Sequence, residues 1–136
     1  SRCKGIQEPY YRWPQNMATD AAAASDAAGE LGQLCNAEGV ERTFVLGPGP
    51  PIRVRQLAFG SRFVAEHKGG TLWPSGELLA TFLARRLKAW LPGRRTLELG
   101  CGAAALPGLV ASRLGAEVTL TDLPEVVEVA RRNALS

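Results

Sequence analysis

The apolar positions after residue 42 recur with the periods of strands and helices. Residues 43–46 (Thr-Phe-Val-Leu) and 52–57 (Ile-Arg-Val-Arg-Gln-Leu) are typical of two strands, and a Gly-Pro-rich connection at 47–51 separates them. The second run alternates apolar and polar residues. This pattern predicts a β-hairpin with one face toward solvent.

A helical period follows the hairpin. Ser75 is a candidate N-cap, and Pro92-Gly93 ends the run of helical spacing. We therefore expect an amphipathic helix over about 76–91. Its apolar face would contain Leu78, Leu79, Phe82, Leu83, Leu87, Trp90 and Leu91.

The last forty residues predict a βαβα series. Strands are expected at 96–99 and 117–122, and helices at 106–114 and from Pro124 onward. Strand, helix and strand at this spacing indicate a parallel pair with a right-handed crossover. A parallel sheet needs several strands and helices on both faces. We therefore expect residues 42–136 to be the N-terminal half of a larger, doubly wound α/β domain.

Residues 1–41 differ in composition from the rest. Seven alanines fall between Ala18 and Ala28, in a low-complexity run that offers little apolar surface to bury. We expect this segment to be disordered. Met17 is either the natural start, with a leader before it, or an ordinary internal methionine of a fragment.

Charge and cysteine content exclude several classes of protein. No run approaches the roughly 18 apolar residues of a membrane span, and the first residues are too polar for a signal peptide. Cys3, Cys35 and Cys101 form no C-x-x-C pair, so neither a disulfide framework nor a metal site is predicted. We expect a cytoplasmic or nuclear protein with no membrane partner.

The net charge of +3 is unevenly distributed along the chain. Residues 17–41 carry a net charge of −5, whereas residues 42–95 contain ten basic and two acidic side chains. We interpret the basic part as solvated faces, because its cations are spread over a hairpin and one helix without interleaved aromatic residues. No nucleic-acid partner is expected.

The Gly100-Cys101-Gly102 turn follows the first parallel strand. Glycines there let a ligand approach the backbone, and Asp122, 20 residues after Gly102, would accept hydrogen bonds from ribose hydroxyls. Gly100-x-Gly102-x-x-Ala105 also fits a dinucleotide fingerprint, so a nicotinamide-dependent oxidoreductase stays an alternative. Glu98 favours a cationic cofactor over a diphosphate, because its carboxylate would repel the diphosphate.

Four segments resemble one enzyme family. Residues 97–102 (Leu-Glu-Leu-Gly-Cys-Gly), 106–111 (Leu-Pro-Gly-Leu-Val-Ala), 114–124 (Leu-Gly-Ala-Glu-Val-Thr-Leu-Thr-Asp-Leu-Pro) and 72–75 (Leu-Trp-Pro-Ser) are similar to class I, seven-β-strand methyltransferases. Within that class they resemble the protein-lysine branch formerly called nicotinamide N-methyltransferase-like. The resemblance implies a Rossmann-like sheet, the cofactor S-adenosylmethionine and a lysine nitrogen of a protein substrate as acceptor.

The resemblance also implies a site. Gly100, Cys101 and Gly102 would line the methionine moiety, Asp122 would hold the ribose, Trp73 would border the pocket, and Glu98 would anchor the turn or face the amino end. Residue type alone favours a core role for Trp73, seating the helix on the sheet, and only the resemblance favours the pocket. Cys101 is interpreted as a small turn residue whose backbone matters. His67 is interpreted as a loop residue, and no catalytic residue is assigned.

One departure from the family pattern concerns Ala103 to Ala105. The family usually has two residues ending in glycine at this point, whereas this chain has three alanines. The extra residue would either rotate the following helix by about 100° or be absorbed as a local bulge. A non-catalytic binding or interaction fragment therefore stays a further alternative, and the oligomeric state is left open.

Overall fold

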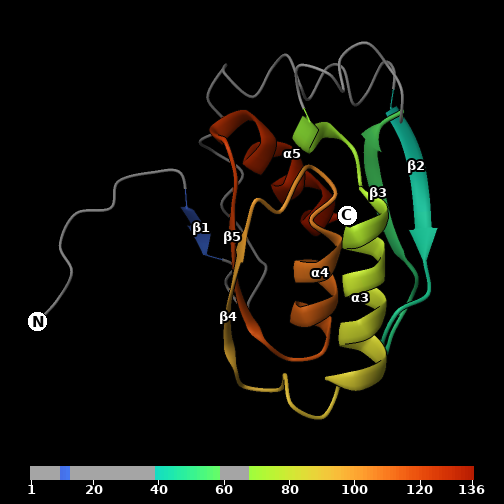
Figure 1. Cartoon of the computed structure of the whole chain (residues 1–136), viewed down its shortest axis with the longest axis vertical. Helices are drawn as coiled ribbons and strands as arrows, with labels where there is room; N and C mark the ends of the chain where they lie inside the picture. Colours follow the sequence, from blue (N-terminus) through green and yellow to red (C-terminus); the bar gives the residue numbers. More distant parts are fainter. Residues whose placement is uncertain (1–9, 13–38, 59–67) are drawn as a thin grey trace, which may run out of the picture.

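The computed structural model describes residues 10–12, 39–58 and 68–136. These residues form an α/β arrangement of two separate sheets and three α-helices (Figure 1). In chain order the elements are β1 (Tyr10–Arg12), β2 (Gly39–Phe44), β3 (Ile52–Leu57), η2 (Lys68–Gly70), α3 (Pro74–Arg86), β4 (Arg95–Leu99), α4 (Leu106–Arg113), β5 (Glu117–Thr121) and α5 (Pro124–Leu135).

The larger sheet has the strand order β1-β5-β4. Strands β4 and β5 are parallel and are connected through α4, as the spacing predicts. Strand β1 pairs antiparallel with the other edge of β5, and Tyr11 lies opposite Leu120. Within residues 1–41, for which we expected disorder, Tyr10–Arg12 form this strand and residues 39–41 belong to β2. The edge of β5 offers backbone groups with which an extended segment can pair. Residues 13–38 lie outside the described residues.

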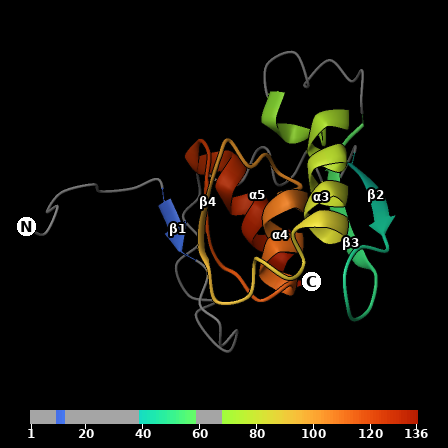
Figure 2. The same cartoon turned by 60° about the horizontal axis from the view of Figure 1, so that its bottom comes forward.

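All three α-helices lie on the same side of the larger sheet (Figures 1 and 2). Alternation along β4 decides which side chains face them. Thr96 and Glu98 are partly buried, whereas Leu97 and Leu99 are 60% and 75% exposed. Helices on both faces, as a doubly wound domain requires, are not found among the described residues.

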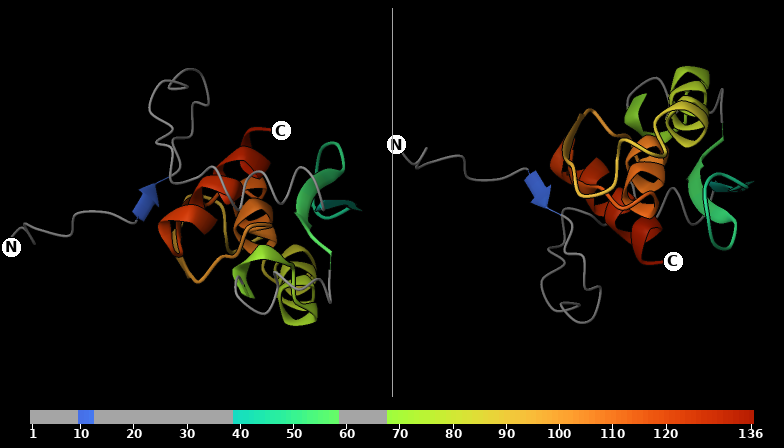
Figure 3. Two further views of the ribbon diagram at one scale, coloured as in Figure 1. Left: turned by 90° about the horizontal axis from the view of Figure 1, so that it is seen from above. Right: turned by 90° about the horizontal axis from the view of Figure 1, so that it is seen from below.

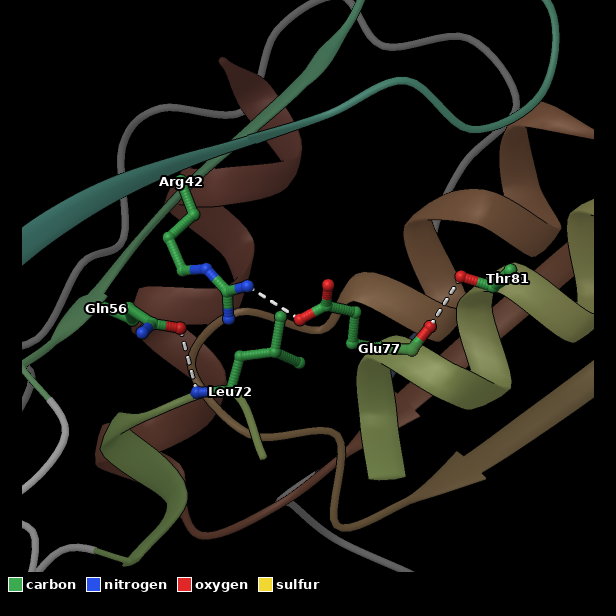
Figure 4. Close-up of polar contacts among 5 residues, drawn as sticks. All are labelled: Arg42, Gln56, Leu72, Glu77 and Thr81. Atoms are coloured by element: carbon green, nitrogen blue, oxygen red, sulfur yellow. Dashed lines mark hydrogen bonds and ion pairs between the residues drawn. The ribbon is translucent and has the colours of Figure 1, made fainter. Parts of the chain in front are cut away.

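The smaller sheet pairs β2 with β3 in antiparallel register, with Phe44 opposite Ile52. Strand β2 begins at Gly39, four residues before the expected start. Strand β3 has the predicted alternation, but its Gln56, which was expected on the solvent face, is only 3% exposed. Its burial is compensated because Gln56 Oε1 accepts a hydrogen bond from the backbone N–H of Leu72 at 2.9 Å (Figure 4).

Side chains connect this smaller sheet to two helices. Arg42 of β2 forms an ion pair with Glu77 of α3, with 2.6 Å between Nη2 and Oε2 (Figure 4). On α5, Asn133 is 8% exposed. Its Oδ1 accepts a hydrogen bond from the backbone N–H of Arg55 at 2.9 Å, and its Nδ2 donates one to the carbonyl of Arg55 at 2.8 Å. Asn133 thus pairs with β3 much as a neighbouring strand would.

Helix α3 differs at both ends from the expected range of 76–91. Trp73 is its N-cap and Pro74 occupies the first turn, where a fixed φ and a missing N–H are tolerated. At the other end Leu87 is the C-cap, so the helix stops at Arg86. Leu91 is 2% exposed, but it belongs to the turn that follows the helix and not to the helix itself.

The expected apolar face of α3 is only partly buried. Ala80 is fully buried, but Leu78 is 72% and Phe82 is 48% exposed. Periodicity placed these residues in one stripe, yet only part of the stripe is covered: Leu83 and Leu87 pack against the core together with Ala80 and Ala84. The largest fully buried side chains of the described residues are Leu57, Leu91, Leu106, Val54 and Val110.

Candidate functional site

The glycine turn joins β4 to α4 at the carboxyl edge of the larger sheet. Gly100 and Gly102 have φ values of +67° and +66°, in the left-handed region that favours glycine. The Cys101 N–H donates to the carbonyl of Thr121, at the end of β5, over 2.9 Å. The Ala103 N–H donates to the carbonyl of Gly69 over 2.6 Å. The turn is therefore fixed between β5 and η2.

The alanine run ends at Ala105, directly before α4. This residue is the N-cap of α4 and has left-handed angles, φ 45° and ψ 30°, although its side chain is fully buried. The carbonyl of Ala103 accepts a hydrogen bond from Asn133 Nδ2 at 2.7 Å. The chain therefore enters α4 through a left-handed residue at the end of the alanine run.

Asp122 lies directly beside the glycine turn. Its Oδ2 accepts a hydrogen bond from the Gly102 N–H at 2.7 Å, and its Oδ1 accepts one from the Leu123 N–H at 2.8 Å. A carboxylate oxygen can accept more than one hydrogen bond. Asp122 can therefore orient the turn and still bind hydroxyl groups of a ligand.

Glu98 is a buried carboxyl group under the start of α4. Its Oε2 is inaccessible to solvent and has no hydrogen-bond partner. Burial raises its pKa from 4.5 to about 7; the backbone amide of Gly108 lowers the pKa in part, and the charge of Asp122 raises it. This carboxyl group therefore titrates near neutral pH and could respond to a cation beside it.

Gly108 lets α4 approach the sheet closely above Glu98. A Cβ at this position would lie 2.3 Å from Leu120 Cδ2 and 2.6 Å from Glu98 Oε2. Neither distance is compatible with a side chain. The close approach of α4 is thus one cause of the desolvation of Glu98.

Trp73 is 42% exposed, so it is not the enclosed core residue that its type alone would favour. Its indole N–H donates to the carbonyl of Lys68 over 3.0 Å. This hydrogen bond links the start of α3 to η2.

These elements enclose one open cavity of about 720 Å³. It brings together all six residues that the sequence singled out, and it also contains residues that the sequence reasoning missed. The six are Trp73, Glu98, Gly100, Cys101, Gly102 and Asp122. The missed ones include Lys68, Gly69, Thr71, Thr96 and Gly108.

The missed residues gave weak signals in the sequence. Gly69 belongs to a Gly-Gly pair, which marks a turn but not what it contacts. Thr71 and Thr96 are ordinary loop and strand residues, yet their buried Oγ1 atoms have no hydrogen-bond partner, like Glu98 Oε2. Three buried polar atoms in one cavity lining point to a polar ligand, because unpaired buried groups are costly.

Cys101 contributes its backbone rather than a reactive thiol. Burial, and then the charges of Glu98 and Asp122, raise its pKa to about 12. Its thiol therefore stays protonated at neutral pH.

Two other kinds of site are absent from the described part of the chain. No group of three or more His, Cys, Asp or Glu side chains could hold a metal ion there. Within the same residues, no helix has the length and apolar character needed to cross a membrane. His67 lies outside the described residues.

Comparison with known proteins supports one family. The model of a family described as lysine methyltransferase matches residues 56–135, more than half of the chain. The rat "Histone-arginine methyltransferase METTL23" is 43% identical over 80 residues, which are 59% of this chain and 34% of that protein. The bovine "Protein-lysine methyltransferase METTL21E" is 43% identical over 60 residues, 43% of this chain and 20% of that protein.

A third relative has another kind of acceptor in its name. The "Ubiquinone biosynthesis O-methyltransferase" of Xanthomonas campestris is 54% identical over 46 residues, 33% of this chain and 19% of that protein. The chain thus spans about a third or less of the length of these three relatives.

Proposed function

We propose, from the premise that this chain belongs to the lysine methyltransferase family, that its cavity binds S-adenosylmethionine. Methyltransferases of this family use this methyl donor. The observation that carries the proposal is the convergence of Glu98, the glycine turn and Asp122 on one cavity. With this family, the dinucleotide interpretation of the glycine turn is no longer needed.

The polar lining of the cavity fits this cofactor. S-adenosylmethionine has a sulfonium and an ammonium group, two ribose hydroxyls and an adenine. Among the described residues, two carboxylates, Glu98 and Asp122, and one cation, Lys68, line the cavity. An ionised Glu98 therefore leaves an excess of negative charge, which favours a cationic ligand and opposes a diphosphate.

Each residue then has a role that follows from its position. The backbone of Gly100, Cys101 and Gly102 lines the methionine moiety, and Asp122 accepts hydrogen bonds from the ribose hydroxyls. Glu98 provides the counter-charge for the cationic end, and Trp73 borders the opening. The Rossmann-like, doubly wound sheet of the class I methyltransferases is the domain that this arrangement would belong to.

The matched segment supports a role in cofactor binding rather than in acceptor choice. The names of the relatives give arginine, lysine and a ubiquinone-pathway oxygen as acceptors. Similarity to enzymes with different acceptors is expected to reflect what they have in common, the methyl donor. When bound, this donor supplies a methyl group that a neutral nucleophile takes in an in-line displacement, which depends on positioning.

We propose a lysine nitrogen of a protein as the acceptor. The description of the matching family names lysine, and two of the relatives above are named as enzymes that act on proteins. Transfer of a tritiated methyl group to a lysine peptide, an arginine peptide and recombinant histones tests this acceptor. Labelling of the arginine peptide alone would contradict lysine as the acceptor while leaving the donor site intact.

Calorimetric titration tests the donor site itself. The chain is titrated with S-adenosylmethionine, S-adenosylhomocysteine and NAD. Asp122→Ala should weaken S-adenosylmethionine about ten- to a hundredfold, because it removes charge-assisted hydrogen bonds worth roughly 1.5–3 kcal/mol. Asp122→Asn should lose less, because the amide still accepts one bond.

Glu98→Gln separates the two cofactor classes. Loss of this charge should weaken cationic S-adenosylmethionine but not a negatively charged dinucleotide. Glu77→Gln, a carboxylate on α3 outside the cavity lining, is the matched control and should leave binding unchanged. Binding of NAD without binding of S-adenosylmethionine would refute the proposal, and binding of neither would favour the non-catalytic alternative.

A further inference from the structure

A second surface stands out at the end of the molecule opposite the glycine turn. Five basic residues lie within residues 85–95, and the sequence has no acidic residue from 78 to 97. All five side chains are exposed. We call the surface of residues 85–95 the basic end. Its cations are Arg85, Arg86, Lys88, Arg94 and Arg95.

These cations have few carboxylates around them. The ion pairs found among the described residues involve Arg42, Arg131 and Arg132, and none of the five. One acid, Glu117, lies opposite Arg95 in the register of β4 and β5. Arg85 and Arg86 suit the C-terminal end of α3, where cations are favoured. The other three cations lie beyond the helix, where the helix dipole gives no reason for them.

An exposed tryptophan lies among the cations. Trp90 is 54% exposed, and the guanidinium carbon of Arg94 is 5.0 Å from the centroid of its ring. The expectation that no aromatic residue lies among these cations is therefore wrong at this place, whereas their exposure to solvent is as expected. Tryptophan and arginine are the residues that most often dominate the energy of protein interfaces.

The loop that presents these groups is held in one conformation. The N–H groups of Trp90 and Leu91 donate to the carbonyl of Leu87 over 2.9 and 3.0 Å. The N–H of Arg94 donates to the carbonyl of Leu91 over 3.0 Å, and Leu91 itself is 2% exposed. The N–H of Glu117 donates to the carbonyl of Arg94 over 2.8 Å. The backbone of this loop therefore loses little conformational entropy when the surface binds a partner.

The basic end is separate from the candidate cofactor site. Strand β4 runs from Arg95 at one end to the glycine turn at the other, a length of about 16 Å for five residues. The view from below shows the end of α3 and the following loop together on this side (Figure 3). None of the five cations lines the cavity described above. A partner at the basic end would therefore leave the cavity open.

We propose that the basic end is a docking surface for an acidic segment of a protein partner. Carboxylates of such a segment would pair with the guanidinium groups, which match them bidentately. An apolar side chain between the acids would contact the indole of Trp90. The proposal requires neither the cofactor nor methyl transfer, so it stands apart from the function proposed above.

A protein segment fits this surface better than nucleic acid does. Proteins that bind single strands follow the backbone with a charged groove. These five cations line neither the candidate cofactor cavity nor the smaller cavity beside α4 and the end of α5, and one of them, Arg94, contacts an exposed indole. The two relatives named for protein substrates also point to protein partners for this family. Nucleic acid is the competing outcome of the test.

Fluorescence anisotropy with the full chain provides the test. One probe is a short labelled peptide in which Glu and Asp alternate around a single Phe. The second probe has Gln and Asn in place of these acids, and the third is an oligothymidine of similar length. We expect saturable binding of the acidic peptide that weakens with salt, and weak or no binding of the other two.

Arg94→Glu is the decisive variant. It should weaken the acidic peptide by about tenfold, because it removes an ion pair, introduces repulsion and uncovers Trp90. Arg132→Glu on α5, a matched charge reversal away from the basic end, should change affinity less than about twofold. Trp90→Ala should also weaken the peptide, and circular dichroism verifies that each variant is folded. Lys88→Glu replaces Arg94→Glu if the latter does not fold.

Three results would overturn the proposal. The first is the absence of saturable binding of the acidic peptide, and the second is an equal loss in Arg94→Glu and Arg132→Glu, which would indicate an effect of net charge alone. The third is tighter binding of the oligothymidine than of the acidic peptide. That result would assign the surface to nucleic acid.

Discussion

Replacing Glu98 with glutamine should stabilise the ligand-free chain above neutral pH. The substitution keeps the shape of the side chain and removes its charge. In the fold this carboxyl group lies under α4, with Oε2 buried and unpartnered. Ionisation of the native residue therefore places a charge in a poorly solvated position, where the backbone amide of Gly108 compensates it only in part.

The magnitude follows from the raised pKa. Burial is the main cause that raises the pKa of Glu98 from 4.5 to about 7. One pKa unit corresponds to about 1.4 kcal/mol. The folded chain keeps a proton that the unfolded chain releases between these two pH values, so the stability from this group is lost as pH rises from about 4.5 to about 7. The loss amounts to ~3 kcal/mol and is constant at higher pH.

The glutamine variant lacks this loss, so its advantage should depend on pH. Relative to wild type, Glu98→Gln should gain less than ~1 kcal/mol at pH 5 and ~3 kcal/mol at pH 8. Urea denaturation followed by circular dichroism, in steps of pH and without cofactor, gives both free energies of unfolding. Comparison at each pH cancels the titration of other groups.

Glu77→Gln is the control for the substitution itself. It removes a carboxylate from the ion pair with Arg42, so it should destabilise the chain by up to ~1 kcal/mol rather than stabilise it. If Glu98→Gln changed stability equally at pH 5 and pH 8, or destabilised the chain at pH 8, the account of a buried and only partly compensated carboxylate would be refuted.

Three further substitutions test how the site is built. In thermal denaturation, Gly108→Ala should lower the free energy of unfolding by more than ~2 kcal/mol, because its Cβ would overlap Leu120 and Glu98. Gly76→Ala, whose Cβ would meet only the end of a flexible leucine at 2.9 Å, is the control and should leave stability almost unchanged. Ala105→Val should cost ~2 kcal/mol or more by urea denaturation, because a β-branched residue is forced into a left-handed conformation in a buried place; an unchanged midpoint would contradict that conformation. Asn133→Leu should cost ~2–5 kcal/mol, since it leaves three backbone groups without a partner, and faster amide exchange in β3 would show where the loss occurs.

Local sequence patterns were enough to predict the elements around the candidate site. Periodicity and turn chemistry fix strands β4 and β5, helix α4 between them and the glycine turn, because these depend on neighbours a few residues apart. The proximity of Asp122 to Gly102 also followed, since the carboxyl ends of parallel neighbouring strands meet at one edge.

Element ends and exposed faces were less well determined. The apolar pattern of α3 continued to Leu91, but the helix stops at Arg86 and Leu91 is buried from a turn. An apolar stripe indicates which residues could be covered, and the neighbouring elements decide which are. Trp90 and Phe82 remain exposed for this reason.

The hydrogen-bond partners and the pKa values of individual side chains followed only from the three-dimensional packing. Asn133 contacts Ala103 across 30 positions of the chain, and Gly108 lets α4 pack closely on Glu98, whose pKa is raised by burial. No local pattern encodes such contacts, because they depend on how closely two elements pack. Sequence periodicity specifies which face of an element is apolar, whereas desolvation and hydrogen-bond partners depend on distances of a few tenths of an ångström between segments that meet only in the folded chain.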